Sequence, residues 1–248
     1  MDATEKSSSS LSLSPPIRLS KSKIAAFEHC PKRLWLQIHR PDLGRIDEAT
    51  LQLFARGHEV GQLARVRTPG GILVEDDHRN LVGAIEHTRQ LLNAPDQRPI
   101  FEAAFQRDGV VIRADILEPD GWGGWKLAEV KNSASVKPYQ LLDAATQAWV
   151  LRGSDICISS IVIRHVERPL RSQRHFFRTR FIDADVTADV LQLIFQRKGV
   201  IDRARAVVRA AEPHIQPGRH CVRPFRCEFR EHCAARAAVT AGRSTQSE

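Results

Sequence analysis

Four cysteines constrain the fold of this chain more than any other feature of its sequence. Cys30 stands near the start, whereas Cys221, Cys227 and Cys233 form a C-x5-C-x5-C cluster near the end. A metal centre that used all four thiols would require the two ends of the ordered chain to meet. The spacing therefore favours a fold whose first and last segments are joined around one site.

The length and net charge of the chain limit the classes of protein to which it could belong. The chain has 248 residues, of which 42% are hydrophobic, and this is enough to fill one core. Lys and Arg number 37 against 29 for Asp and Glu, which gives a net charge of +8. This balance favours an anionic partner, with nucleic acid ahead of a membrane surface. A basic surface kept for solubility explains the charge about as well.

The ends of the chain differ from its middle. Residues 1–16 are rich in serine and lack the basic start and apolar core of a signal peptide. We expect a disordered tail over 1–16, one domain over 17–236 and a second disordered tail over 237–248. No apolar run is long enough to span a membrane. We therefore expect a cytoplasmic protein in a reducing compartment, where disulfides are rare.

Hydrophobic periodicity predicts a mixed α/β protein. A helix capped by Ser20 or Ser22 and a second helix starting at Pro31 open the ordered chain. Further helices are expected over 48–65, 78–92, 139–151 and 186–211. Strands are expected over 72–74, 100–105, 110–117, 125–131, 156–163 and 176–182. Cys157 falls within one of these apolar strands and is expected in the core.

The hairpin between two of the expected strands carries a pattern of charged side chains. A loop centred near Trp122 sets Asp115 opposite Glu129, and strand period puts Lys131 on the same face as Glu129. Opposed carboxylates repel each other, and a bound Mg²⁺ or Mn²⁺ reverses that repulsion. Lys131 would then orient or deprotonate a water, or neutralise a phosphate. The alternative is an exposed sheet face with a salt bridge between Lys131 and Asp115.

Two polar residues on helices beside this hairpin strengthen the metal-site hypothesis. His58 shares an apolar helix face with Leu51 and Phe54, and Gln147 shares one with Ala144. Each alone is more often a satisfied core residue than a functional one. Together, on helices that bracket the hairpin, they look like parts of a site.

Taken in order, these segments resemble the RecB-like branch of the PD-(D/E)XK nuclease superfamily. Within it, the chain is most similar to the four-cysteine, CRISPR-associated exonuclease-like group or a close uncharacterised relative. The resemblance runs from Leu19 to Cys233. The segments that carry it are LSKSKIAAFEHCPKRLWL, ARGHEVGQLA, VVIRADIL, WKLAEVKNSASVK and DAATQAWVL, followed by the closing cysteine triplet.

The resemblance implies a restriction-endonuclease-like PD-(D/E)XK core, a mixed central sheet flanked by helices, closed by an iron–sulfur staple between its N- and C-terminal segments. It also implies a DNA exonuclease acting on single-stranded ends in DNA repair, recombination or CRISPR spacer acquisition. Its implied partners are single-stranded DNA and proteins of repair or CRISPR adaptation.

The resemblance also assigns roles to individual residues. His58, Asp115 and Glu129 would bind Mg²⁺ or Mn²⁺, with the carbonyl of Val130 as a further ligand. Lys131 would position or activate the attacking water and stabilise the transition state. Gln147 would help shape the site, and Glu102 would support it from the preceding strand. Basic residues could contact the DNA backbone, among them Lys21, Lys23, Lys32, Arg33 and Lys137. For each of these taken alone, a solvated surface charge is the commoner explanation.

The sequence departs from the family pattern at two places. Leu151 stands where the family often has a tyrosine, four residues after Gln147. The closing cysteine triplet is also spaced more evenly than is usual in the CRISPR-associated proteins, and it suits the related subgroup equally well.

The four cysteines fit an iron–sulfur centre better than a zinc site. Structural zinc sites usually contain a close pair such as C-x2-C, and this sequence has none. Thiolates spread as one plus three suit a [4Fe–4S] cluster, and the resemblance implies the same cofactor. Zinc stays as the alternative because His29, His220 and His232 each precede a cysteine. Two further functions stay open: a non-cleaving nucleic-acid-binding protein of this fold, and a structural zinc protein that binds a protein partner.

Overall fold

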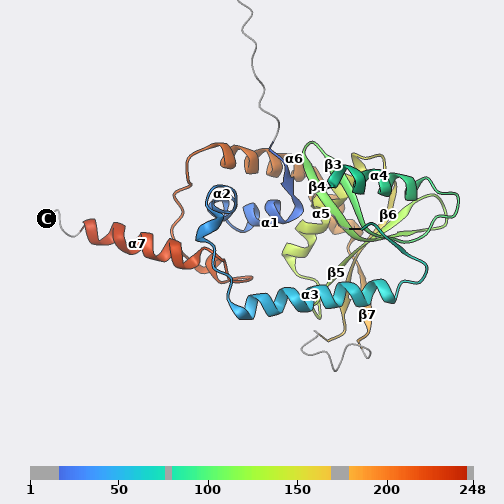
Figure 1. Cartoon of the computed structure of the whole chain (residues 1–248), viewed down its shortest axis with the longest axis horizontal. Coiled ribbons are helices and arrows are strands. Elements are labelled where there is room, and N and C mark those ends of the chain that lie inside the picture. Colours follow the sequence, from blue (N-terminus) through green and yellow to red (C-terminus); the bar gives the residue numbers. More distant parts are fainter. Residues whose placement is uncertain (1–16, 76–79, 169–178, 245–248) are drawn as a thin grey trace, which may run out of the picture.

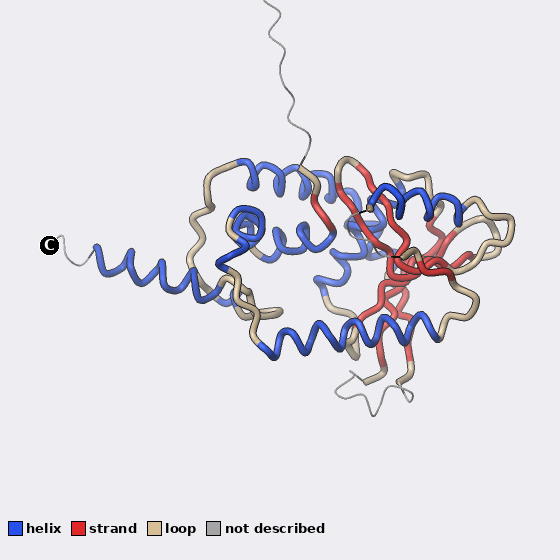
Figure 2. Tube along the Cα trace, viewed as in Figure 1, coloured by secondary structure: helices blue, strands red, loops and turns tan. Residues whose placement is uncertain are grey.

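The computed structural model describes residues 17–75, 80–168 and 179–244, with side chains as far as residue 238. Within these ranges the chain is a mixed α/β protein with a curled mixed sheet flanked by helices (Figures 1 and 2). The predicted tail over 1–16 lies outside the described residues, as do the start of the expected helix over 78–92 and the first part of the expected strand over 176–182.

The sheet has seven strands among the described residues. Its order is β2-β3-β4-β5-β6-β7, and the short β1 pairs with β4 off this path. Strands β3, β4 and β5 form an antiparallel meander, whereas β5 and β6 are parallel and are connected through α5. The bounds are β1 Leu19–Ser20, β2 Ile72–Leu73, β3 Ile100–Arg107, β4 Val110–Pro119, β5 Trp125–Lys131, β6 Ile158–Val166 and β7 Phe181–Asp185.

The helices begin and end close to where the periodicity predicts. Ser20 caps the first by accepting a hydrogen bond from the Lys23 amide at 3.3 Å, and Pro31 opens the second. The bounds are α1 Lys21–His29, α2 Pro31–His39, α3 Glu48–Val66, α4 Leu81–Leu92, α5 Pro138–Arg152, α6 Thr187–Arg209 and α7 Arg230–Ser244, with short 3₁₀ turns at Pro41–Leu43 and Arg219–Cys221. None of the described helices is both long enough and apolar enough to span a membrane.

Both faces of the sheet are covered. Leu117 and Leu127 point to one face, where they belong to a core cluster with the small residues Ala144 and Ala148 of α5. Their neighbours Ile116 and Ala128 point to the other face and cluster with Ala64 of α3. The alternation follows from the two-residue period of a strand. The alanines of α5 leave room for the helix to lie close against the sheet, so nearly all of its second half is buried.

The N-terminal half of α3 corrects one prediction. Leu51 and Phe54 were expected on a buried face, but they are 48% and 54% exposed. Only the last two turns of the helix pack on the protein, through Val60, Leu63 and Ala64. The rest of α3 extends past the sheet toward the C-terminal segment (Figure 1). Helical periodicity identifies an apolar face but does not show whether another element covers it.

Two further predictions differ from the structure. Cys157 is exposed because β6 begins only at Ile158, and the cysteine lies in the connection before the strand. Helix α7 continues to Ser244 and so occupies most of the segment over 237–248 that was expected to be disordered. Its alanine-rich sequence has high intrinsic helix propensity.

We expect Leu127→Ala to lower the free energy of unfolding by about 2–5 kcal/mol, because the leucine is fully buried at the centre of the sheet. The matched control is Leu53→Ala, since Leu53 is 58% exposed on α3. That control should stay within about 0.5 kcal/mol of the wild type. Urea denaturation followed by circular dichroism measures both, and equal losses would contradict the assigned core.

Candidate functional site

Three neighbouring strands bring three carboxylates together. The pairing of Ile116 with Ala128 places the next residues along, Asp115 and Glu129, beside each other, as the sequence predicts. On the other side of β4, Glu102 falls opposite Asp115 in the register of β3, where it adopts a left-handed φ of 55°. Each of β3, β4 and β5 therefore contributes one acid to the same part of the sheet.

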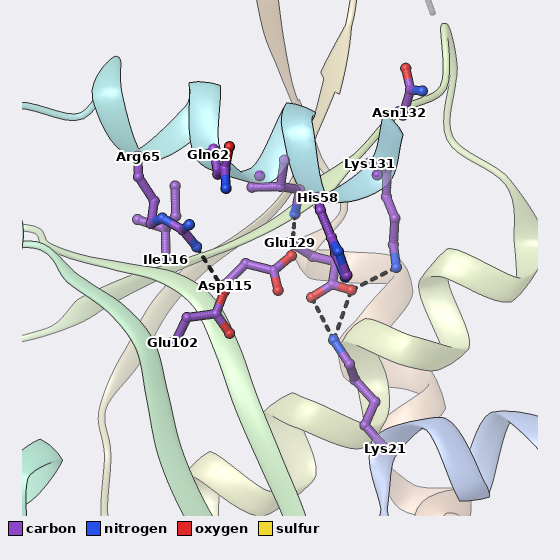
Figure 3. A pocket seen from close by; sticks show the side chains of 13 residues that line it. Lys21, His58, Gln62, Arg65, Glu102, Asp115, Ile116, Glu129, Lys131 and Asn132 are labelled. Atoms are coloured by element: carbon purple, nitrogen blue, oxygen red, sulfur yellow. Dashed lines mark hydrogen bonds and ion pairs between the residues drawn. The ribbon is translucent and has the colours of Figure 1, made fainter. Parts of the chain in front are cut away.

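These acids line one pocket, shown in Figure 3. Its volume is about 440 Å³. One wall comes from α3 through His58, Gln62 and Arg65, and another comes from Lys21 at the start of α1. Val130 and Lys131 of β5 complete the lining near the acids. The pocket thus joins residues that are more than a hundred positions apart in sequence.

Glu129 is the most enclosed of these acids, with an exposed fraction of 1%. Lys21 Nζ lies 2.9 and 3.0 Å from its two carboxylate oxygens, and Lys131 Nζ lies 2.7 Å from Oε1. Gln147 of α5 donates from Nε2 to Oε2 at 2.5 Å. Burial alone would raise the pKa of Glu129, but Lys131 and Lys21 outweigh it and hold that pKa well below its usual range.

Lys131 is held as a cation. Its Nζ binds Glu129 and also lies 3.0 Å from Asp143 Oδ2 on α5. Burial would lower the pKa of Lys131, but Glu129 and Asp143 raise it well above its ordinary value. A protonated lysine cannot take a proton from water, so this arrangement suits positioning and charge neutralisation better than general-base chemistry. The ammonium pairs with these two acids instead of forming the cross-strand bridge to Asp115.

Asp115 titrates in the opposite direction from Glu129. Its Oδ2 accepts a hydrogen bond from the Val130 amide at 2.8 Å, which ties β4 to β5. Burial and the neighbouring Glu129 raise the pKa of Asp115 to about 7, against the opposing effect of Lys21 and Lys131. The two acids of the hairpin are therefore unequal: Glu129 stays ionised, whereas Asp115 gains its charge only near neutral pH.

His58 and Gln147, the two helical residues predicted for the site, differ in their exposure to solvent. His58 is exposed on α3 and lines the pocket. Gln147 is fully buried on α5, and its Oε1 has no hydrogen-bond partner in the part of the chain that the structure describes. A buried amide oxygen without a donor is unfavourable, by about 1–3 kcal/mol in typical proteins. Gln147 is therefore placed to hold the Glu129 carboxylate, although its own amide oxygen is left unsatisfied.

Sequence reasoning missed two members of this site. Lys21 was expected to contact the DNA backbone, but it binds Glu129. Its position depends on the two-residue β1, whose parallel pairing with β4 brings the start of α1 to the pocket. Asp143 was not singled out at all. Its only signal is that it lies four residues before Gln147, and so on the same face of α5.

The predicted cysteine ligands also come together. Cys30, Cys221, Cys227 and Cys233 all line one small cavity between α2, the turn at 219–221 and α7. Arg33 and Gln37 of α2 both hydrogen-bond Glu228, so the first and last described segments meet as predicted. Burial raises the pKa of the Cys227 thiol to about 11.

The donor types at the two sites differ, and each suits a different metal. Carboxylate oxygens with one imidazole suit Mg²⁺ or Mn²⁺, whereas four thiols suit zinc or an iron–sulfur cluster. Within the described ranges, no three His, Cys, Asp or Glu side chains already stand in an arrangement that would hold a metal ion. At Glu129, the ammonium groups of Lys21 and Lys131 already bind the carboxylate.

Comparison with known proteins adds little to this description. No model of a known protein family matches the chain, and none of the curated proteins matches it. One solved structure to which it is similar is described as the crystal structure of SSO0001. The two share 12% identity over 76% of this chain and 78% of that chain, with a TM-score of 0.35. Such a slight likeness carries no argument about fold or function.

The raised pKa of Asp115 makes a prediction about pH. A carboxyl whose pKa rises on folding, here from 3.8 to about 7, stabilises the fold at acid pH, and that stability is lost as pH rises through both values. In ion-free protein, we expect Asp115→Asn to raise the free energy of unfolding at about pH 8 by about 1–3 kcal/mol, allowing for the water that reaches a half-buried carboxyl.

The gain should shrink as the pH falls toward about 4, because the wild-type carboxyl is then protonated when folded. Asp120→Asn is the matched control. Asp120 accepts hydrogen bonds from the Trp122 and Gly124 amides, which lower its pKa, so its loss should destabilise rather than stabilise at neutral pH. Urea denaturation over a pH series measures both. A gain from Asp115→Asn that does not vary with pH would contradict the assignment.

Proposed function

We propose that this protein is a Mg²⁺- or Mn²⁺-dependent deoxyribonuclease of the RecB-like PD-(D/E)XK type, acting as an exonuclease on single-stranded DNA ends. The observation that carries the proposal is the convergence of Glu102, Asp115, Glu129 and Lys131 in one pocket of a basic protein. Basic charge attracts a polyanionic substrate, and paired carboxylates with a lysine suit phosphodiester hydrolysis. DNA repair, recombination and CRISPR spacer acquisition are the processes that such an activity would serve.

In this proposal the divalent ion is held by His58, Asp115 and Glu129, with the carbonyl of Val130 as a further ligand. When bound, the ion would lower the pKa of a water and polarise the phosphate. The raised pKa of Asp115 supports a cation here, since it reflects burial and repulsion from Glu129 that a positive charge would relieve.

The remaining chemistry belongs to side chains of the chain itself. Lys131, kept protonated by Glu129 and Asp143, would bind a non-bridging phosphate oxygen and stabilise the charge that develops there. Gln147 would hold the Glu129 carboxylate in place from behind. Asp143 would fix the direction of the Lys131 ammonium. These roles are charge stabilisation by Lys131 and orientation by Gln147 and Asp143, and none requires a side chain to gain or lose a proton.

Lys131→Met should lower the rate of nucleotide release from single-stranded DNA with Mn²⁺ by about 10²-fold or more, because it removes one positioned charge from the transition state. The matched control is Lys126→Met on the same strand. The Lys126 ammonium binds Glu118 and Asp183, outside the pocket, so its loss should leave the rate near that of the wild type. An inactive wild type would refute the nuclease and favour a non-cleaving DNA-binding protein, which a gel-shift assay would then detect.

We further propose that Cys30, Cys221, Cys227 and Cys233 hold a [4Fe–4S] cluster, with zinc as the alternative. Their common cavity and their origin in the two terminal segments support one shared centre. Four thiol ligands without a close C-x2-C pair fit a cluster. Its role would be structural, because it would join the segment that carries Lys21 to the C-terminal segment.

Protein purified without oxygen should absorb near about 400 nm and contain iron, as expected of a cluster with thiolate ligands. Cys30→Ser or Cys227→Ser should lose both the absorbance and the iron, and should melt at a lower temperature. Cys157→Ser is the matched control, because Cys157 is exposed and lies outside the cavity. Colourless wild-type protein with one zinc per chain would contradict the cluster and favour the zinc site.

A further inference from the structure

Lys21 binds the Glu129 carboxylate from a different element than its other two partners, Lys131 and Gln147. It is the first residue of α1, and its Nζ reaches both carboxylate oxygens at 2.9 and 3.0 Å. The lysine side chain is 21% exposed, whereas that of Glu129 is 1% exposed. Figure 3 shows it approaching from the side of the pocket opposite α3. Both the lysine and the carboxylate that it binds line the pocket.

The hydrogen-bonding capacity of Glu129 is filled. A carboxylate has about four lone-pair positions. In this structure Oε1 meets the Lys21 and Lys131 ammonium groups, and Oε2 meets Lys21 and the Gln147 amide. A divalent cation could therefore bind Glu129 only after one of these contacts breaks.

Of the three partners of the Glu129 carboxylate, Lys21 is the one that can leave most easily. Lys131 has a second acid, Asp143, and Gln147 is fully buried on α5. Among the described residues, the Lys21 ammonium donates its hydrogen bonds to Glu129. Its four-carbon stem is flexible, and the side chain already borders the open pocket. Lys21 can therefore move into the open pocket when an ion binds, whereas Lys131 is retained by Asp143 and Gln147 is enclosed on α5.

We propose that Lys21 is a resident counter-ion of the pocket that competes with the divalent cation for Glu129. In the ion-free protein it joins Lys131 in neutralising the Glu129 carboxylate, which is buried beside Asp115 and Glu102. Each ion that binds must displace it, so the lysine weakens ion binding. The inference rests on the proposed function, because it assumes that the pocket takes a divalent cation.

The experiment is a calorimetric titration of the full chain with Mn²⁺. Lys21→Met should bind Mn²⁺ about tenfold more tightly than the wild type, because a competing charge a few ångströms from the ion is gone. Lys21→Arg keeps the charge and should stay near the wild type. Lys23→Met is the matched control on the same helix, since Lys23 Nζ donates to the Gln37 carbonyl at 3.3 Å, away from the pocket.

A second readout protects the test against loss of stability in the variant. Added Mn²⁺ should raise the melting temperature of Lys21→Met more than that of the wild type, whatever their starting values. Equal or weaker binding by Lys21→Met, with Mn²⁺ still bound by the wild type, would overturn the competition and leave the metal site standing. Absence of Mn²⁺ binding in all variants would overturn the metal-dependent function, and the inference with it.

Discussion

The burial of one carboxylate determines how the elements around it pack. Glu129 lies in the middle of the sheet with almost no access to water, where an unpaired charge would be strongly destabilising. It is compensated by groups from three elements: Lys21 of α1, Lys131 of its own strand and Gln147 of α5. The packing of α1 and α5 near the end of β5 is thus tied to the same atoms that form the pocket. The contacts that compensate this carboxylate therefore contribute to both the fold and the candidate site.

The same arrangement bears on how the lysine of a D…ExK pattern can act. Two acids hold the Lys131 ammonium, and its pKa lies above the ordinary value. Such a lysine contributes charge and direction, while the group that accepts a proton from water has to be found elsewhere. Burial and the neighbouring Glu129 raise the pKa of Asp115 to about 7, so the protonation state of this acid changes in the physiological range.

Much of this was predictable from sequence because it is local. The loop centred near Trp122 fixes the register of the hairpin, and this places Asp115 beside Glu129. Periodicity and caps gave most helices within a few residues. Side-chain environment depended on what packs against each element. Thus Leu51 and Cys157 are exposed although their segments are apolar, and Lys21 reaches the pocket through a two-residue strand that no pattern announces. The metal sites and the nuclease activity stay predictions.

Helix α1 directly connects the acidic pocket to the cysteine cavity. Lys21 is its first residue, and Cys30, which directly follows it, caps its C-terminal end and opens α2. A helix of this length is a stiff rod of about 13 Å. One end carries a charge on the central acid of the pocket, and the other carries a thiol of the cysteine cavity. One short helix thus sets the separation between a charge in the acidic pocket and a thiol of the cysteine cavity.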